Sequence, residues 1–249
     1  MNNKVFVSGS ISINKLPDIV KNSLDKIIEN NLIILVGDAS GIDTLVQNYC
    51  NDKKYFNIIV YSIYPIPRYK VNDNFKSKYI EVSNEIKKER QRQTHKDKAM
   101  SDDSNYSLVI WDEKSKGSYA NVIRALESKK AVKVYINREN IFIAKEDVTS
   151  TNIEFIYRKS NGYTASEVVA YLDKNGIYSF SRITDLNKYL IEKEILKKED
   201  KIYIPVKDFE NLFILDMYRG KAKGIKFKNE FFDWFESNKP INTIQESLF

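Results

Sequence analysis

Short apolar runs alternate with helix-patterned segments along the first 140 residues, and this alternation is the feature that most constrains the fold. Strands are predicted at residues 5–7, 32–36, 57–61, 106–111 and 131–136. Helices are predicted between them, at residues 16–29, 44–49 and 119–128. Because consecutive parallel strands are joined by right-handed helical crossovers, the pattern predicts an α/β fold with a doubly wound, parallel, Rossmann-like sheet.

Three glycine-bearing turns lie after or near the predicted strands. They are Ser8-Gly9-Ser10, the segment from Gly37 to Asp43, and the segment from Ser115 to Ser118. A turn from a strand into a helix leaves backbone N–H groups without partners at the positive end of the helix dipole, and glycine lets a ligand approach them. Carboxyl ends of parallel strands share one edge of a sheet, so we expect the three turns to cradle anions there. The alternative for each turn alone is a plain turn or helix cap.

Length, charge and hydropathy restrict the class of protein. The chain has 249 residues, of which 42% are hydrophobic, which suits one large domain and one small one. The net charge of +6 lies mainly in the first 150 residues and suits a small polyanionic ligand at least as well as DNA. No run of eighteen apolar residues occurs, and the N-terminus leaves no room for a signal peptide, so we expect a soluble, cytoplasmic protein without a membrane partner.

Cysteine and histidine usage argues against redox and zinc chemistry. Cys50 is the one cysteine, which excludes an intramolecular disulfide, and its place after an apolar helical face predicts core packing. His95 is the one histidine and lies in a polar segment, where a solvated side chain is expected. We therefore expect neither a metal nor a cofactor.

The pattern changes after residue 137. Residues 141–144 and 153–157 are predicted as edge strands, and residues 159–162 as a linker. This divides the chain into a nucleotide-binding domain, residues 1–158, and a small, mostly helical, winged-helix-like module, residues 159–249. In that module Thr164 and Glu167 have capping-box spacing, residues 183–194 form a second helix, residues 201–205 a wing strand, and residues 226–235 the closing segment.

The motifs of residues 4–137 resemble those of the SLOG superfamily. These Rossmann-like domains join the DNA-processing Smf/DprA proteins to the LOG phosphoribohydrolases. The similar segments, in order, are Val7–Ser10, Val36–Asp43, Arg68, Lys96–Met100 and Ile110–Ser118. The resemblance implies a nucleotide-derived ligand lying across the strand ends, and a homo-oligomer of two or more subunits.

The resemblance also implies a set of ligand-binding residues. Backbone amides of residues 8–10 and 117–118 would hold phosphates, Asp38 or Asp43 would face ribose or base, and Arg68 would pair with a phosphate. The alternatives are that Asp43 caps a helix, that Arg68 is a surface charge, and that Lys96 and Asp97 form an exposed pair. The full set is Ser8, Gly9, Ser10, Gly37, Asp38, Gly41, Asp43, Arg68, Lys96, Asp112, Ser115, Gly117, Ser118 and Asn121.

The sequence departs from the LOG enzymes at the position that bears on catalysis. Those enzymes carry a glutamate after the glycine-rich turn, and this chain has Asn121 where an acid would be expected. Asparagine is neither a carboxylate base nor a charge that stabilises an oxocarbenium ion. The chain therefore reads as a binder rather than an enzyme, with Asp38 and Asp43 as the candidate catalytic residues and Asp112 as a further acid if it has an activity.

Residues 160–238 resemble the KilA-C and antirepressor winged-helix modules of phage proteins. The similar segments are Tyr163–Val168, Leu186–Leu190 and Tyr203–Pro205. Three functions stay open. The first is sensing or sequestering a nucleotide-derived signal of the cyclic ADP-ribose or cyclic nucleotide type, for example as a phage anti-defence sponge. The second is N-glycosidic cleavage of a nucleotide. The third is DNA binding through the C-terminal module under control of a nucleotide.

Overall fold

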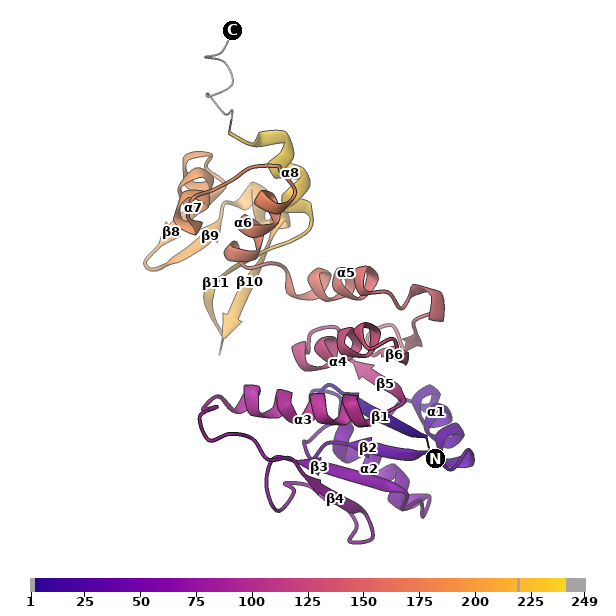
Figure 1. The fold of residues 1–249 in the computed structure, drawn as a ribbon. Coiled ribbons are helices and arrows are strands. Elements are labelled where there is room, and N and C mark those ends of the chain that lie inside the picture. Colours follow the sequence, from indigo (N-terminus) through magenta and orange to yellow (C-terminus); the bar gives the residue numbers. More distant parts are fainter. Residues whose placement is uncertain (1–2, 219, 241–249) are drawn as a thin grey trace. The chain divides into compact units, whose positions relative to one another are not determined.

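The computed structural model describes residues 3–218 and 220–240, and it divides the chain into two compact units. Figure 1 shows the order of the elements. Unit 1 is Met1–Ile156 and unit 2 is Tyr157–Phe249. The division falls within helix α5 (Ser150–Asn161), two residues before the boundary expected from the sequence. The closing residues 241–249 lie outside the described part of the chain.

Unit 1 is built on a seven-stranded sheet with the order β4-β3-β2-β1-β5-β6-β7. Six strands are parallel, and β7 is antiparallel to β6. The α/β fold with a doubly wound, mainly parallel sheet is therefore confirmed. The strands are β1 (Lys4–Gly9), β2 (Ile33–Val36), β3 (Ile58–Ser62), β4 (Lys76–Tyr79), β5 (Tyr106–Trp111), β6 (Ala131–Ile136) and β7 (Ile141–Phe142).

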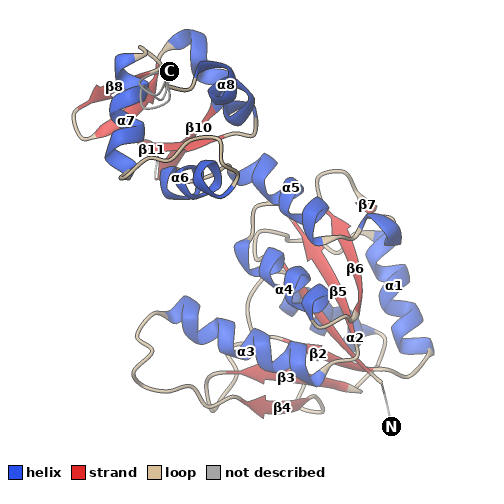
Figure 2. Cartoon of the chain, turned by 45° about the horizontal axis from the view of Figure 1, so that its top comes forward, coloured by secondary structure: helices blue, strands red, loops and turns tan. Residues whose placement is uncertain are grey.

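Helices cover both faces of this sheet because successive strand residues point to opposite faces. Helices α1 (Asp18–Glu29) and α2 (Ile42–Asp52) pack on the face that carries Val5 and Val7. Helices α3 (Glu89–Asp103) and α4 (Lys116–Glu127) pack on the other face, where Phe6 contacts Met100 of α3. Figure 2 shows the helices on either side of the strands.

Two parts of unit 1 differ from the sequence-based expectation. Residues 76–79, which are not among the predicted strands, form the edge strand β4, whose four side chains are all exposed. A strand with lysines on the edge of a sheet has no buried face and therefore no hydrophobic alternation to predict it. Residues 153–157 and 159–161, expected as an edge strand and a linker, lie in α5. There Ile153 is buried and Phe155 is exposed, which is helical and not strand periodicity.

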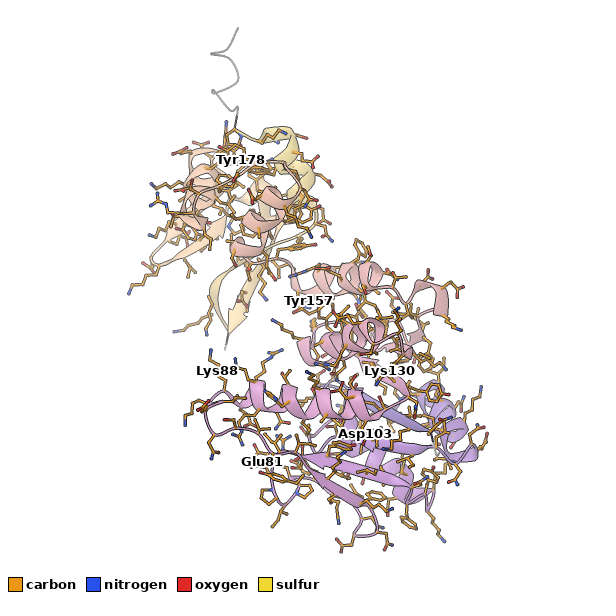
Figure 3. All side chains as sticks on the ribbon, in the orientation of Figure 1. Glu81, Lys88, Asp103, Lys130, Tyr157 and Tyr178 are labelled. Carbon is orange, nitrogen blue, oxygen red and sulfur yellow. The ribbon has the colours of Figure 1, made fainter. Side chains whose placement is uncertain are left out.

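Polar networks tie the far end of α3 to the sheet. Asp103 accepts hydrogen bonds from Lys4, Lys78 and Tyr61, and Lys130 donates to backbone carbonyls at the end of α3. Figure 3 labels Asp103 and Lys130. These contacts fix α3 along the sheet, so that its first half is held beside the carboxyl ends of the strands.

Unit 2 combines helices with two antiparallel hairpins around an aromatic core. Phe213, Phe227, Phe231 and Phe235 are buried together. The predicted capping box is present, because Thr164 and Glu167 exchange hydrogen bonds at the start of α6. The elements are α6 (Ala165–Lys174), α7 (Ile183–Glu192), β8 (Leu196–Glu199), β9 (Ile202–Pro205), η2 (Lys207–Leu212), β10 (Phe213–Tyr218), β11 (Lys221–Phe227) and α8 (Glu230–Asn238).

The expectation of a mostly helical module holds only in part. The predicted wing strand is β9, which pairs with β8, but the hairpin of β10 and β11 is not predicted. Its strands carry Asp216, Lys221 and Lys223 among the apolar residues, so the period-two pattern is interrupted. The predicted closing segment, residues 226–235, spans the end of β11 and the start of α8.

Candidate functional site

The strand order reverses between β1 and β5, and the candidate site lies at this switch point. The chain leaves β1 toward α1 on one face of the sheet and leaves β5 toward α4 on the other. Connections that diverge in this way leave a crevice at the carboxyl ends of the strands. All three predicted turns follow strands of this edge, β1, β2 and β5, as the alternation of strands and helices predicted.

Asp38, two residues after the end of β2, is buried and holds the surrounding loops together through its hydrogen bonds. Its side chain is 0% exposed, and its carboxylate accepts hydrogen bonds from Ser62 Oγ at 2.8 Å, Arg68 Nη2 at 2.9 Å and Lys96 Nζ at 3.0 Å. Burial alone would raise the pKa of Asp38, but the hydrogen bond from Arg68 and the charge of Lys96 outweigh it and hold that pKa well below its ordinary value.

This network gives the predicted ligand-binding residues Asp38, Arg68 and Lys96 partners within the chain. Both oxygens of Asp38 are engaged by protein groups, so the geometry does not favour a ribose contact or an acid–base role for it. Arg68 pairs with Asp38, and its guanidinium lies over the ring of Tyr64. Lys96 is 3% exposed and is not half of a solvated pair.

Asp112, directly after β5, is a second engaged carboxylate. It accepts hydrogen bonds from Ser10 Oγ at 2.8 Å, Ser12 Oγ at 2.6 Å, and the backbone N–H groups of Lys114 at 3.0 Å and Ser115 at 2.7 Å. Burial would raise the pKa of Asp112, and these hydrogen bonds lower it. The backbone N–H groups of Lys114 and Ser115, at the beginning of the β5–α4 turn, therefore already donate to the carboxylate of Asp112.

The start of α4 is the part of this turn that stays open. Ser115 caps the helix by accepting the N–H of Ser118 at 3.4 Å. The N–H groups of Lys116 and Gly117 lie in the first turn, where a helix supplies no acceptor. Ser118 Oγ lies 3.3 Å from Ser10 Oγ, which joins this turn to the one after β1.

The glycines of the three turns differ in what surrounds them. A Cβ atom at Gly9, Gly37 or Gly41 would lie 2.5, 2.2 or 2.6 Å from another atom of the protein, and Gly41 also has a φ of +75°. At Gly117 the nearest such atom is 3.9 Å away. Gly9 and Gly41 are required by close packing within the chain, Gly37 lies against the side-chain ends of Asp43 and Lys96, and Gly117 leaves room for a side chain or a ligand.

Two further carboxyl groups, Asp43 and Asp97, lie near Lys96 and are only partly buried. Asp43 accepts the N–H of Ala39, in the turn before α2, at 3.2 Å, whereas the N-cap position is Gly41 and no side chain caps α2. Burial raises the pKa of Asp43. Burial raises the pKa of Asp97 to about 6 against the charge of Lys96. Within the described chain Asp97 makes no hydrogen bond. The sequence placed it inside a motif but did not single it out.

Further polar side chains lie on the side of the sheet covered by α3 and α4. Asn121 is buried, and its Oδ1 accepts a hydrogen bond from Arg124 Nη1 at 2.6 Å. The described residues offer no hydrogen-bond partner to Ser8 Oγ or Gln93 Oε1, although both atoms are buried. The hydroxyl groups of Ser101 in α3 and Ser107 in β5 are also buried without a hydrogen-bond partner in the described residues.

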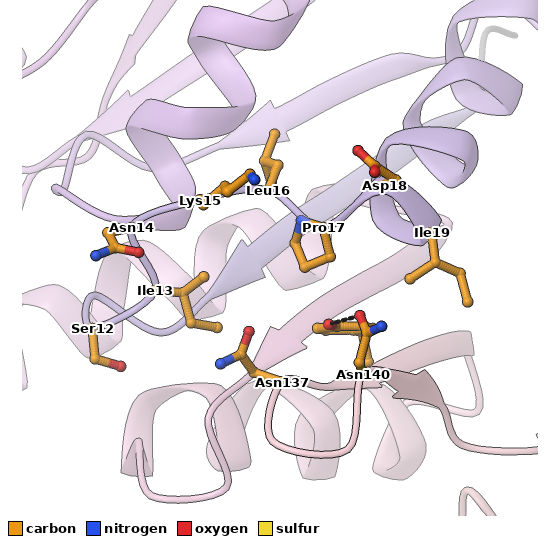
Figure 4. Close-up of a pocket in the computed structure, with 11 residues that line it drawn as sticks. Ser12, Ile13, Asn14, Lys15, Leu16, Pro17, Asp18, Ile19, Asn137 and Asn140 are labelled. Carbon is orange, nitrogen blue, oxygen red and sulfur yellow. Dashed lines mark hydrogen bonds between the residues drawn. The ribbon is translucent and has the colours of Figure 1, made fainter.

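An open cavity of about 470 Å³ lies beside the switch point on the α1 side. Figure 4 shows the loop from Ser12 to Pro17, the start of α1, and Asn137 and Asn140 around it. Ser12 lines the cavity and donates to Asp112, so one hydrogen bond links the cavity wall to the turn before α4. The residues predicted for the site are not among those that line this cavity. The sequence did not indicate the cavity, because its polar lining residues belong to no motif.

Other candidate chemistries find little support. Among residues 3–218 and 220–240, no group of three His, Cys, Asp or Glu side chains could hold a metal ion. Cys50 is buried as predicted, and burial raises the pKa of its thiol to about 12, whereas His95 is exposed. In that same part of the chain, no helix has the length and apolar character needed to cross a bilayer.

Comparison with known proteins gives two distant structural likenesses. No family model and no curated protein matches the chain. The Moco carrier protein from Chlamydomonas reinhardtii is 16% identical with a TM-score of 0.38, over 54% of this chain and 76% of that one. DNA processing protein A from Helicobacter pylori, described for its single-stranded DNA binding mode, is 16% identical with a TM-score of 0.40, over 77% and 81%. Likenesses this distant carry no functional assignment, and membership of the SLOG and KilA-C families stays a prediction.

Proposed function

We propose that unit 1 binds a small, nucleotide-derived molecule at the carboxyl edge of its parallel sheet. The observation that carries the proposal is the convergence of three turns at the β1/β5 switch point, where parallel α/β sheets bind their ligands. The 470 Å³ cavity beside this point is within the usual size range of small-molecule sites.

The start of α4 is the position that we assign to a phosphate group. The amides of Lys116 and Gly117 point outward at the positive end of a twelve-residue helix, and Gly117 leaves space in front of them. Lys116 adds a positive charge in the same turn. Ser10 and Ser118 supply hydroxyl groups at the junction with β1.

Binding without turnover is the version that the side chains favour. Asp38 and Asp112 are held by protein partners, and Asn121 replaces the acid expected after the turn. We therefore propose that the chain senses or sequesters its ligand, which would be a signal of the cyclic ADP-ribose or cyclic nucleotide type. An anti-defence sponge is one form that such sequestration would take.

Calorimetry tests this proposal directly. The full chain is titrated with cyclic ADP-ribose, cyclic dinucleotides and nucleoside 5′-monophosphates, and at least one is expected to release heat with a one-site isotherm. The bound molecule is then recovered after heat denaturation and identified by mass spectrometry. Intact ligand indicates a binder and a cleaved product indicates an enzyme. An absence of heat with every compound would refute the proposal.

A matched pair of variants locates the phosphate. Gly117→Asp adds a negative charge at the open turn of α4, and we expect it to weaken binding about tenfold or more, since each 1.4 kcal/mol is tenfold. Gly224→Asp adds the same charge in β11, where a Cβ atom meets no other atom within 4 Å, and is expected to leave binding unchanged. Equal binding by both variants would exclude the α4 turn.

A further inference from the structure

We propose that Asp97 is a ligand-binding residue of the crevice and that its carboxylate accepts hydrogen bonds from adjacent N–H donors on a nucleobase edge. Guanine carries such a pair of donors and adenine does not. This inference rests on the proposed function and adds to it the class of base that the site selects.

Asp97 is the carboxyl group near Lys96 that the protein leaves without a hydrogen bond. Asp38 accepts from Ser62, Arg68 and Lys96, and Asp43 accepts from a backbone amide. Within the described residues Asp97 accepts from none, although it is enclosed enough for burial to raise its pKa to about 6. A partly exposed carboxyl group in that situation has its acceptor capacity available to a ligand.

Ser8 provides an independent indication of a ligand on this side of the sheet. Its side chain is 5% exposed, and its hydroxyl group has no partner in the described chain. Ser8 stands between Phe6, which packs on α3, and Ser10, which bonds to α4, so strand alternation directs it to the same side. A buried hydroxyl group without a partner costs stability unless a water molecule or ligand satisfies it.

Gln93 adds a second acceptor next to Asp97. The two residues are four positions apart on α3 and therefore lie on one face of the helix. Gln93 Nε2 donates to Glu89 at 2.8 Å, whereas its Oε1 is buried without a partner. Two neighbouring acceptors fit a ligand that presents adjacent hydrogen-bond donors, as the N–H groups of a nucleobase edge do.

The charges around Asp97 are set by the elements packed against it. Lys96 on α3 and Arg124 on α4 stabilise the carboxylate, and Asp43 and Asp38 oppose it, while burial is the largest influence and favours the neutral form. The acceptor form is therefore populated above about pH 6. Binding of a donor edge is expected to strengthen as the pH rises from 5 to 7.5.

Guanine matches this arrangement and adenine does not. The N1–H and 2-amino groups of guanine form two parallel donors to one carboxylate, and the N1 position of adenine is an acceptor that would face it. One good bidentate contact discriminates between bases by about 10- to 100-fold. Inosine, which keeps N1–H and lacks the 2-amino group, is expected to fall between them.

The test compares guanosine, inosine and adenosine 5′-monophosphate by calorimetry with the full chain at pH 5 and pH 7.5. The expected order is guanosine, inosine, adenosine at pH 7.5, with the spread reduced at pH 5. Asp97→Asn is expected to abolish both the preference and the pH dependence. Asp102→Asn, an exposed position on the same helix, serves as the control and is expected to retain both.

The possible failures separate this inference from the proposed function. Equal binding of all three nucleotides, or binding of cyclic ADP-ribose alone, overturns the inference and leaves the proposed function standing. A guanosine preference that persists in Asp97→Asn also overturns it. No binding of any nucleotide refutes both. The order of affinities and its pH dependence in the unsubstituted chain decide the matter if Asp97→Asn does not fold.

Discussion

The substitution Asp38→Asn tests whether the charged network after β2 holds unit 1 together. It leaves Lys96, whose side chain is 3% exposed, without the carboxylate that lies 3.0 Å from its Nζ. Removing one partner of a buried ion pair costs about 3–5 kcal/mol, because the other charge stays buried and uncompensated. Arg68 is 38% exposed and adds little, since its guanidinium reaches water.

Urea unfolding measures this loss. In a Trp234→Phe background, Trp111 in β5 is the remaining tryptophan, and its fluorescence reports on unit 1. The free energy of unfolding is expected to fall by about 3–5 kcal/mol in Asp38→Asn and to recover in part when Lys96→Met is added. Asp102→Asn should stay within about 0.5 kcal/mol. A loss below about 1 kcal/mol for Asp38→Asn, or no recovery in the double variant, would refute the reasoning.

The same network sets a dependence of stability on pH. The pKa of Asp38 is lowered in the folded chain, so its contribution is complete above the ordinary value of 3.8 and is lost as the pH falls below it. The free energy of unfolding of the unsubstituted chain should therefore fall more than that of Asp38→Asn as the pH decreases from about 4 to 2. If the free energy of unfolding falls equally with pH in the unsubstituted chain and in Asp38→Asn, Asp38 is not the origin of the pH dependence.

Three other substitutions have defined outcomes. Gly37→Ala should destabilise unit 1 by about 1–3 kcal/mol, because the new methyl group would lie 2.2 Å from Asp43 Oδ2, whereas Gly224→Ala meets no atom within 4 Å and should leave unit 1 unchanged. Thr164→Ala removes the α6 cap and should lower the urea stability of unit 2 by about 1 kcal/mol. Asp103→Asn removes the carboxylate that accepts from Lys4, Tyr61 and Lys78 and should destabilise unit 1 at neutral pH, and this loss should disappear as the pH falls from 3.8 toward about 2. Unchanged denaturation midpoints would refute each.

The sheet of unit 1 could be predicted because its central strands carry their own signal. Residues 33–36 and 106–111 are buried on both faces and read as continuous apolar runs, and their turns begin where those runs end. Edge strand β4 and the hairpin of β10 and β11 carry charges within the strand and give no such signal. Strands could be predicted where their own residues are apolar and buried. They could not be predicted where strand formation depends on pairing with a neighbouring strand.

The contacts within the site could not be predicted, for a related reason. Asp38 lies 30 positions from Arg68 and 58 from Lys96, and a parallel sheet brings these three residues together through two crossovers. The sequence supplied the residue types but not the partners. Asp38, Arg68 and Lys96 were each predicted to contact a ligand, and in the folded chain Arg68 and Lys96 instead donate hydrogen bonds to Asp38.

The glycine-bearing turns correctly indicated the carboxyl edge of the sheet, but close packing within the chain, and not ligand binding, explains most of their glycines. Gly9, Gly37 and Gly41 are explained by atoms of the chain that would collide with a Cβ, so they need no ligand to account for them. Gly117 has no such collision and stands at an open helix start, which gives the phosphate a place on α4. Asp97, whose carboxyl group accepts no hydrogen bond from the described residues, lies on α3. A ligand of this crevice is therefore expected to be held between α3 and α4, and substitutions there should change its affinity more than substitutions in the turn after β2.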